Sequence, residues 1–310
     1  MRDSPVPRLV TTLGGLSLPA EGVILPHEHV FVDLRTPDTP GHGEAETAAV
    51  VALMAPLLRR AREAGIAAIV DAGPVGVGRR ADLLLAVSEA SGVPLLVPTG
   101  VYREPWIPAW VREADEGRLG EWMAGELAAG IGDTGVRAGW IKLSAGDDGM
   151  TPCEAKVLRA AARAAAAGGA ALGSHTIRGR VVLRQLDEAE RCGFDPRRFV
   201  WIHAQVEADH GLRREAARRG AWIELDSIGR PDGDAGVLDL LRRCLDDGLA
   251  DRLLLSQDRG WYDPAKPGGG EPLAYHHLVE AFLPLALRSG IAQPTIDALV
   301  RVNPWRAFAR

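Results

Sequence analysis

The sequence of 310 residues is poor in cysteine, has no long apolar run and carries no large excess of charge of either sign. Its three cysteines, Cys153, Cys192 and Cys244, are odd in number and form no CxxC pair. This pattern argues against a disulfide framework or a zinc knuckle and favours a reducing compartment. No stretch approaches the roughly 18 apolar residues of a membrane span, and residues 1–10 lack the apolar core of a signal peptide, so we expect a cytoplasmic protein.

The charge balance and the composition restrict the partners. A net charge of -5 gives no electrostatic basis for binding nucleic acid or an anionic membrane, so we expect neither as a partner. The chain is long enough for one large core, and no linker, charge block or low-complexity tract divides it. We therefore predict that residues 1–310 form one domain, in which residues 1–22 are an N-terminal β extension.

Short β-rich runs alternate with amphipathic segments rich in Ala, Leu and Arg, which is the pattern of βα units on a parallel sheet. Eight strands, each followed by a helix, predict an α/β fold of the (β/α)8 TIM barrel type. A short β-hairpin should precede the barrel, with strands over Leu9–Leu13 and Leu16–Leu18 and a turn at Gly14-Gly15. The predicted strands are Val23–His27, Ala67–Ala72, Pro94–Thr99, Gly139–Leu143, Ala170–Ser174, Phe199–His203, Ala221–Leu225 and Arg252–Ser256. The predicted helices cover residues 44–64, 80–91, 118–131, 152–167, 178–192, 207–219, 235–248, 274–289 and 294–301.

Side chains that can bind metal follow several of these strands. His27 and His29 stand two residues apart, and side chains at i and i+2 of a strand point to the same face, so the two imidazoles could hold one metal ion. Alone this pair is a weak signal, because two polar residues in a turn would look the same. The active site of a TIM barrel, however, lies at the carboxyl ends of the strands. The ends of strands four, five, six and eight add Lys142, His175, His203 and Asp258, so the sequence predicts a metal site at this face.

The order His-x-His, Lys, His, His, Asp on strands one, four, five, six and eight resembles the amidohydrolase superfamily. More narrowly, it resembles the phosphotriesterase-related family, in the lactonase-like branch or a close relative of it. The motifs that carry the resemblance are Leu25-Pro-His-Glu-His-Val30, Trp140-Ile-Lys-Leu-Ser-Ala-Gly146, Gly173-Ser-His-Thr176, Trp201-Ile-His-Ala204, Leu254-Leu-Ser-Gln-Asp258 and the closing Asn303-Pro-Trp-Arg-Ala-Phe308. The resemblance covers nearly the whole chain.

This resemblance implies a pair of divalent transition-metal ions. His27, His29 and Asp258 would bind the more buried ion, His175 and His203 would bind the other, and Lys142 would bridge both as a carboxylated lysine. A buried lysine deprotonates readily and can then add carbon dioxide to give an anionic, bidentate ligand. Zinc is the metal we expect first, and the same ligands accept manganese, cobalt, iron or nickel. The resemblance also implies a homodimer.

The chemistry that the resemblance implies is hydrolysis. A hydroxide that bridges two cations is a nucleophile at neutral pH, and one cation polarises the scissile carbonyl or phosphoryl oxygen. Asp258 can take the proton and pass it on. Tyr102 matches the strand-three tyrosine that lies beside the metals in lactonase-like relatives, although packing beside Trp106 is an alternative role. The candidate catalytic residues are therefore Asp258, Lys142 and Tyr102.

The stretch after strand seven departs from the family pattern. Characterised relatives carry His or Arg after a Leu-Asp, where this chain has Ser227. A serine neither relays protons at neutral pH nor offers a cationic fork, and Arg230, three residues on, is a candidate replacement. The long loop after Asp258 adds further candidates, because such loops shape substrate access. The predicted substrate pocket comprises Tyr102, Trp106, Ser227, Arg230, Arg259, Trp261 and Tyr262.

The segment after His203 also differs from the family pattern, because it reads Ala204-Gln-Val-Glu-Ala-Asp209. Glu207 and Asp209 either orient a ligand from outside the site or lie as favourable acids in the first turn of a helix. The sequence does not decide between these two roles.

Three functional hypotheses follow from these residues. The leading one is a binuclear metal-dependent hydrolase of a small lactone or other carboxylic ester, with weak organophosphate triesterase side activity. The second is a phosphorylated sugar-lactone hydrolase, in which Arg103, Arg178 and Arg230 could bind the phosphate. The third is a metal-containing binding protein without turnover. The presence of all six ligands argues against the third, because a binder has no need of an activated water.

Overall fold

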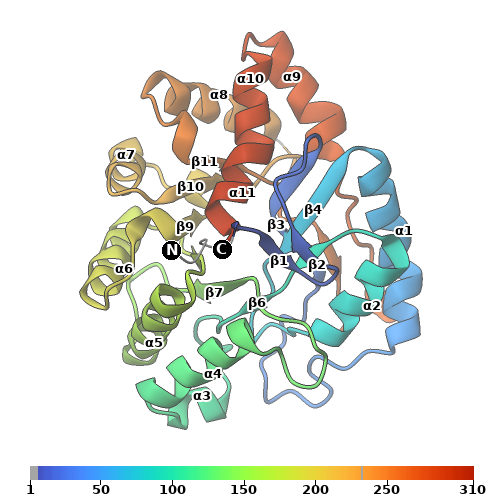
Figure 1. Cartoon of the computed structure of the whole chain (residues 1–310), viewed down its shortest axis with the longest axis vertical. Helices are drawn as coiled ribbons and strands as arrows, with labels where there is room; N and C mark the ends of the chain where they lie inside the picture. The colour runs from blue at the N-terminus through green and yellow to red at the C-terminus, as the bar shows by residue number, and fades with distance from the viewer. Residues whose placement is uncertain (1–5, 232) are drawn as a thin grey trace.

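The computed structural model describes residues 6–231 and 233–310, so residues 1–5 of the expected β extension lie outside the described part. A ring of strands stands at the centre, and helices surround it (Figure 1). The strands are β1 (Leu9–Thr11), β2 (Gly14–Leu16), β3 (Val23–Phe31), β4 (Ile66–Asp71), β5 (Leu95–Leu96), β6 (Pro98–Thr99), β7 (Trp140–Ser144), β8 (Leu172–His175), β9 (Phe199–Ile202), β10 (Trp222–Leu225), β11 (Leu253–Leu255) and β12 (Gly260–Tyr262).

These strands confirm the predicted (β/α)8 barrel. Two parallel runs, β11-β10-β9-β8-β7-β6 and β12-β3-β4-β5, supply its wall, and β5 and β6 are two halves of one strand that is interrupted at Val97. The ring closes between β11 and β3, where the backbone N–H of Asp258 donates to the His27 carbonyl at 3.2 Å. The hydroxyl of Ser256 donates to the same carbonyl at 3.0 Å. β3 is longer than predicted, because it continues past His27 to Phe31.

Helices follow the strands around the outside of the ring. The described helices are α1 (Thr47–Glu63), α2 (Ala81–Ser91), α3 (Ala109–Glu113), α4 (Glu116–Ala128), α5 (Pro152–Gly168), α6 (Gly179–Arg191), α7 (His210–Arg218), α8 (Gly233–Asp246), α9 (Leu283–Arg288), α10 (Gln293–Asp297) and α11 (Asn303–Phe308). None of these described helices is long and apolar enough to cross a membrane. The prediction missed α3, because five residues are too few to show helical periodicity.

The last helix runs further than predicted. It was expected to end at residue 301, but α10 continues through a π-helical turn, Ala298–Val302, into α11. Pro304 lies at the start of α11, and a proline inside a helix lacks an N–H and clashes with the carbonyl four residues earlier. The wider π turn removes that conflict. A second π turn, Leu278–Phe282, stands in the same position before Pro284.

The predicted hairpin is present, but its turn was predicted wrongly. β1 and β2 pair antiparallel with Leu9 opposite Leu16 and Thr11 opposite Gly14, so the turn is Thr12-Leu13 and not Gly14-Gly15. The hydroxyl of Thr11 fixes this turn, because it accepts from the N–H of Leu13 at 3.2 Å and donates to the carbonyl of Gly14 at 2.6 Å.

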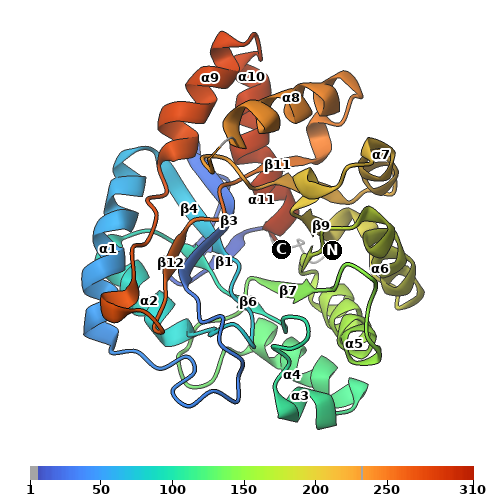
Figure 2. The same cartoon turned by 180° about the vertical axis from the view of Figure 1, so that it is seen from behind.

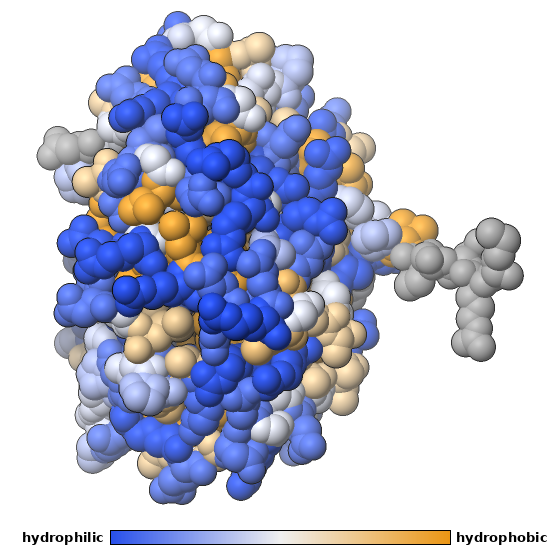
Figure 3. All heavy atoms as spheres, turned by 90° about the vertical axis from the view of Figure 1, so that its left-hand side faces the viewer, coloured by the Kyte–Doolittle hydropathy of each residue, from blue (hydrophilic) through white to orange (hydrophobic). Residues whose placement is uncertain are grey.

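The hairpin and α11 cover one end of the barrel. Inward-facing apolar residues from seven of the barrel strands form a cluster there with Leu9 and with Phe308. The ring of Phe308 meets that of Trp140 edge-on, with 5.2 Å between centroids. The hairpin and the C-terminal end lie on this side (Figure 1), whereas β12 and the loop after β3 lie on the opposite side (Figure 2). The flank formed by α5–α8 is mostly hydrophilic, with apolar side chains in separate patches (Figure 3).

We predict that Phe308→Ala destabilises the barrel by about 3–5 kcal/mol, because a fully buried aromatic side chain is lost from its closed end. Urea denaturation followed by circular dichroism measures the change. Arg306→Ala, an exposed substitution on the same helix, serves as the control and should stay within about 0.5 kcal/mol of the wild type. Equal stability of the two variants would contradict the role given to Phe308.

Candidate functional site

The inner face of the barrel changes from apolar to polar along several strands. Because side chains alternate along a strand, Trp140 and Lys142 both point into the barrel, and the lysine lies one step nearer the carboxyl end. On β10 the inward sequence is Trp222, then Glu224, then Asp226 just past the strand. The apolar half closes one end of the barrel, and the polar half collects ionisable groups at the other.

β3 carries the two histidines of the HxH pair. Its register against β4 shifts between Leu25 and Glu28, and His27 and His29 then both face the barrel interior. Glu28 points the other way, as predicted, and is completely buried. Its carboxylate accepts hydrogen bonds from the hydroxyl of Ser256 at 2.9 Å and from the N–H of Arg259 at 2.7 Å. Glu28 therefore ties β3 to the segment that carries Asp258.

Two candidate ligands stand on left-handed backbone. His203 has a φ of 63° and Asp258 a φ of 54°. Such a conformation is uncommon for residues other than glycine. At His203 it ends β9 and turns the side chain out of the alternation of that strand, in which Val200 and Ile202 face the interior. The N–H of His203 donates to Asp226 Oδ2 at 2.9 Å, and that of Asp258 donates to the His27 carbonyl, so hydrogen bonds hold both distortions.

The predicted ligands converge. The Nε2 atoms of His27 and His29 lie 3.6 Å and 3.2 Å from Asp258 Oδ1. Ligand atoms of His27, His203 and Asp258 all lie within 4.8 Å of one another, and His203 Nε2 lies 2.8 Å from His175 Nδ1. Asp258 Oδ1 is buried and has no hydrogen-bond partner within the described residues. A buried carboxylate oxygen without a donor, among imidazole nitrogens, fits a cation that is held by these groups.

Two acidic residues, one on β10 and one just past it, hydrogen-bond the outer ring nitrogens of two histidines. His27 Nδ1 lies 2.8 Å from Glu224 Oε1, and His203 Nδ1 lies 2.8 Å from Asp226 Oδ1. A carboxylate on one ring nitrogen fixes the tautomer and leaves the other nitrogen free to bind metal. Sequence reasoning missed this pair, although the alternation Trp222, Glu224, Asp226 on a buried strand was a usable signal. His27, Glu224 and Asp226 also satisfy the spacing of a metal site, but the 2.8 Å contact of His27 Nδ1 with Glu224 is a hydrogen bond.

Burial sets the protonation states that metal binding requires. Burial, and then the charge of Lys142, lowers the pKa of His27 to about 3, and burial followed by the charge of His203 lowers that of His175 well below its usual value. Both rings are therefore neutral at pH 7, with lone pairs to donate. Burial also lowers the pKa of Lys142 to about 8. No hydrogen bond or ion pair joins the Lys142 ammonium to another of residues 6–231 and 233–310.

Tyr102 lies at the edge of the same cluster. Its hydroxyl is 3.2 Å from His175 Nδ1, and burial raises its pKa to about 12, so it remains a hydrogen-bond donor. Its ring also packs edge-on against Trp106, at 5.5 Å between centroids. Tyr102 therefore contacts both a candidate metal ligand and Trp106.

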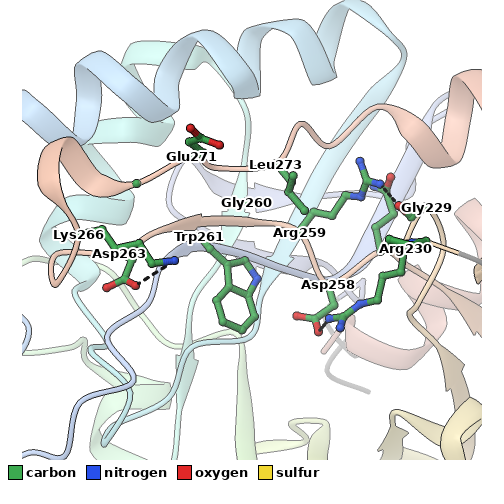
Figure 4. Close-up of a pocket in the computed structure, with 13 residues that line it drawn as sticks. Gly229, Arg230, Asp258, Arg259, Gly260, Trp261, Asp263, Lys266, Glu271 and Leu273 are labelled. Atoms are coloured by element: carbon green, nitrogen blue, oxygen red, sulfur yellow. Dashed lines mark hydrogen bonds and ion pairs between the residues drawn. The ribbon is translucent and has the colours of Figure 1, made fainter.

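Two cavities adjoin the cluster. A small one of about 60 Å³ lies over the six candidate ligands and is also lined by Tyr102 and Trp261. A larger one of about 380 Å³ is lined by Arg230, Asp258, Arg259 and Trp261 (Figure 4). Of the predicted pocket residues, Tyr102, Arg230, Arg259 and Trp261 therefore line a cavity. Trp106, Ser227 and Tyr262 line neither of the two.

Arg230, the candidate replacement for the strand-seven residue, reaches the candidate ligands. Its guanidinium forms an ion pair with Asp258 Oδ2, although Arg230 lies three residues beyond Ser227. The turn after β10 brings it back, since the N–H of Arg230 donates to the Ser227 carbonyl at 3.2 Å. Arg259 has a different role, because its guanidinium hydrogen-bonds the carbonyls of Gly229 and Ala274 and joins two loops.

Glu207 and Asp209 support the backbone after β9. Glu207 accepts from the N–H of Gly179 at 2.7 Å, and Asp209 caps α7 by accepting from the N–H of Gly211 at 2.8 Å. Within the described residues neither carboxylate bonds to a candidate ligand, so the helix-terminus interpretation describes Asp209.

A parallel barrel with histidines, a buried lysine and an aspartate at its carboxyl-end face defines a class of metal-competent hydrolases. The sequence profile of the Phosphotriesterase family matches residues 7–308. The chain belongs to this family, and it is a hydrolase of the phosphotriesterase family.

Relatives support this assignment over nearly full length. The chain is 28% identical to the phosphotriesterase homology protein of Mycobacterium tuberculosis, with 98% of both chains covered. It is 26% identical to an aryldialkylphosphatase of Saccharolobus solfataricus, over 81% of this chain and 83% of that protein. A mutant of a phosphotriesterase-like lactonase from Deinococcus radiodurans superposes with a TM-score of 0.86 at 33% identity, over 96% of this chain and 99% of that one.

We predict that Glu224→Ala lowers the affinity of the site for zinc by about 10- to 100-fold, because His27 loses the carboxylate that orients it. Competition with a chromogenic chelator measures this affinity. Glu224→Gln is the matched control, since its amide oxygen can still accept from His27 Nδ1. This variant should lose much less of the affinity for zinc. If both variants bound zinc like the wild type, Glu224 would have no role in orienting His27.

Proposed function

We propose that this protein is a binuclear metal-dependent hydrolase that cleaves a lactone or another carboxylic ester. The observation that carries the proposal is the convergence of four imidazoles, the Asp258 carboxylate and a desolvated lysine on one small cavity. The family works with two divalent metal ions. The likeness to a phosphotriesterase-like lactonase favours a carboxylic ester as the substrate.

The residues divide between the two metal ions as follows. His27, His29 and Asp258 would hold one ion, and His175 and His203 the other, with Lys142 as a carboxylated ligand to both. The lowered pKa of Lys142 supports this role, since carboxylation needs the neutral amine. All three donor types suit zinc, manganese, cobalt, iron or nickel.

When bound, two divalent cations supply an acidified water as nucleophile and polarise the carbonyl that it attacks. The chain's own residues do the rest. The Asp258 carboxylate accepts the proton of the attacking water, and the Tyr102 hydroxyl beside His175 donates a hydrogen bond to the substrate oxygen. Trp261, whose ring meets His29 edge-on at 5.0 Å, covers the cluster and limits the access of bulk water.

The phosphorylated-lactone hypothesis has less support. Its three candidate arginines do not share a site: Arg103 and Arg178 both lie near Asp147, at 4.0 Å and 3.9 Å, whereas Arg230 pairs with Asp258. A phosphate clamp needs cations that converge on one anion. The similarity to an aryldialkylphosphatase supports weak organophosphate hydrolysis as a side activity.

Metal analysis, with a hydrolysis screen of lactones, esters and amides on the same sample, tests the proposal. We expect close to two transition-metal ions per chain together with turnover of lactones. Two ions without turnover of any substrate would favour the metal-containing binding protein. Turnover of amides alone would make the substrate an amide and not a lactone or ester.

We predict that Asp258→Asn keeps most of the bound metal but lowers kcat/KM by about 10³-fold, because an amide cannot accept the proton. Steady-state kinetics and metal content on the same preparation separate the two effects. Asp239→Asn, a matched change at an exposed position, should leave both unchanged. Turnover near that of the wild type would remove Asp258 from the mechanism.

We predict that metal-free protein reconstituted with zinc gains activity faster when bicarbonate is added, and more so at pH 8.5 than at pH 6.5. Because the pKa of Lys142 is about 8, the neutral amine that adds carbon dioxide increases as the pH rises through this range. Carbon-13 bicarbonate should give a carbamate carbonyl resonance. In Lys142→Met that resonance and the response to bicarbonate should both disappear, and their persistence would exclude a carboxylated Lys142.

A further inference from the structure

The two cavities differ too much in size to hold equivalent parts of a substrate. The cavity over the candidate ligands measures about 60 Å³, which leaves room for little more than the scissile group. The neighbouring cavity measures about 380 Å³, and Asp258 and Trp261 line both. On the proposed function, the bond to be cleaved lies in the small cavity and the remainder of the substrate extends past Trp261 into the large one.

The large cavity has charged groups of both signs, arranged unequally. Its outer part holds Asp263 and Lys266, which lie 3.7 Å apart, and Glu271 (Figure 4). Its inner part, next to the site, holds Arg230 and Arg259 beside Asp258. The Arg259 guanidinium already donates to two backbone carbonyls, so Arg230 is the cation in the inner part that can bind a ligand.

The Arg230 guanidinium has N–H donors that its ion pair with Asp258 does not use. Half of its side chain is exposed, at 52%, and within the described residues its guanidinium hydrogen-bonds only Asp258. A guanidinium carries five N–H donors in a planar fork that matches a carboxylate. If Arg230 served only to neutralise Asp258, the exposed remainder of this fork would have no function in the cavity.

Trp261 adds a second donor at the same place. Its φ of 82° is unusual for a bulky residue and holds the indole between the two cavities. The indole N–H is buried and has no partner within residues 6–231 and 233–310. Its nitrogen lies on the edge of the ring that faces Asp258 and Arg230 (Figure 4). A buried N–H of this kind costs free energy unless a ligand accepts from it.

We infer that the physiological substrate carries an anionic group, of the carboxylate class, in addition to the bond that is cleaved. The Arg230 fork and the Trp261 N–H bind this anion in the inner part of the large cavity, and Arg230 is thereby the specificity-determining residue of the site. Leu273, which is 54% exposed and lines the same cavity, offers an apolar surface to the chain that joins the two groups. This inference rests on the proposed function for the placement of the scissile bond.

A pair of matched lactones tests the inference on the metal-loaded enzyme. One is a γ-lactone that bears a carboxylate, and the other is the same lactone with a neutral carboxamide. The wild type should have a kcat/KM at least 10-fold higher for the carboxylate. Arg230→Met should bring this ratio to about 1, Arg230→Lys should retain part of it, and Trp261→Phe should lower it several-fold. Lys266→Met removes a positive charge from the outer part of the same cavity and should leave the ratio unchanged.

The inference would be overturned if Arg230→Met lowered kcat/KM equally for both lactones, because Arg230 would then act through Asp258 alone. A changed ratio in Lys266→Met with none in Arg230→Met would overturn it as well. Titration calorimetry with succinamate, which has one carboxylate, and with succinamide, its neutral counterpart, separates binding from turnover. Succinamate should bind the metal-loaded wild type at least 10-fold more tightly than it binds Arg230→Met.

The two proposals fail differently in these measurements. If no lactone, ester or amide is cleaved but succinamate binding depends on Arg230, the proposed function fails and the anion site stands. If lactones are cleaved but succinamate binds Arg230→Met as tightly as the wild type, the carboxylate binds elsewhere, such as at the metal ions, and the inference fails alone.

Discussion

The removal of ionisable groups from water at one end of a closed barrel is the constraint on which the site depends. The sequence has only three lysines, and Lys142 is completely buried among histidines and acids. Burial keeps His27 and His175 neutral and brings the pKa of Lys142 close to the physiological range. In an exposed site the same histidines would be partly protonated near neutral pH, and Lys142 would be an ordinary ammonium without a lone pair for a metal ion.

The candidate ligands converge partly because the backbone departs from regular strand geometry at a few residues. Val200 and Ile202 already face the barrel interior, so a β9 that continued regularly past Ile202 would point the His203 side chain outward, away from the histidines of β3. Left-handed backbone at His203, Asp258 and Trp261 costs on the order of 1–3 kcal/mol each. The Asp226 carboxylate and the hydrogen bonds across the β11–β3 closure offset part of this cost.

Much of the fold and of the ligand set could be predicted from the sequence, because both depend on local periodicity. Short β-rich runs between amphipathic segments indicated the strands, and the ends of those strands indicated the six candidate ligands His27, His29, Lys142, His175, His203 and Asp258. The structure confirms the barrel strands and brings the six candidate ligands together. The hairpin turn was predicted wrongly because Gly14-Gly15 is the stronger local turn signal, whereas the hydroxyl of Thr11 fixes the turn two residues earlier.

Features that depend on long-range geometry were harder to predict. Glu224 looks like an ordinary strand residue until β10 is seen to face the interior beside His27. Arg230 was considered a replacement for Ser227, but only the turn after β10 shows that its side chain reaches Asp258. The extension of the last helix past Pro304 depends on a π turn that no local propensity indicates.

Arg8 and Arg310 meet on the side of the barrel away from the site. Arg8 and Arg310 exchange two backbone hydrogen bonds of 3.1 Å, as residues on neighbouring antiparallel strands do. A short peptide bridge could therefore join them without disturbing the wall of the barrel. The barrel should therefore tolerate circular permutation, and new ends opened in an outer loop would leave the loops around the candidate site intact. A tag attached on the side of Arg8 and Arg310 would leave the candidate site facing the solution.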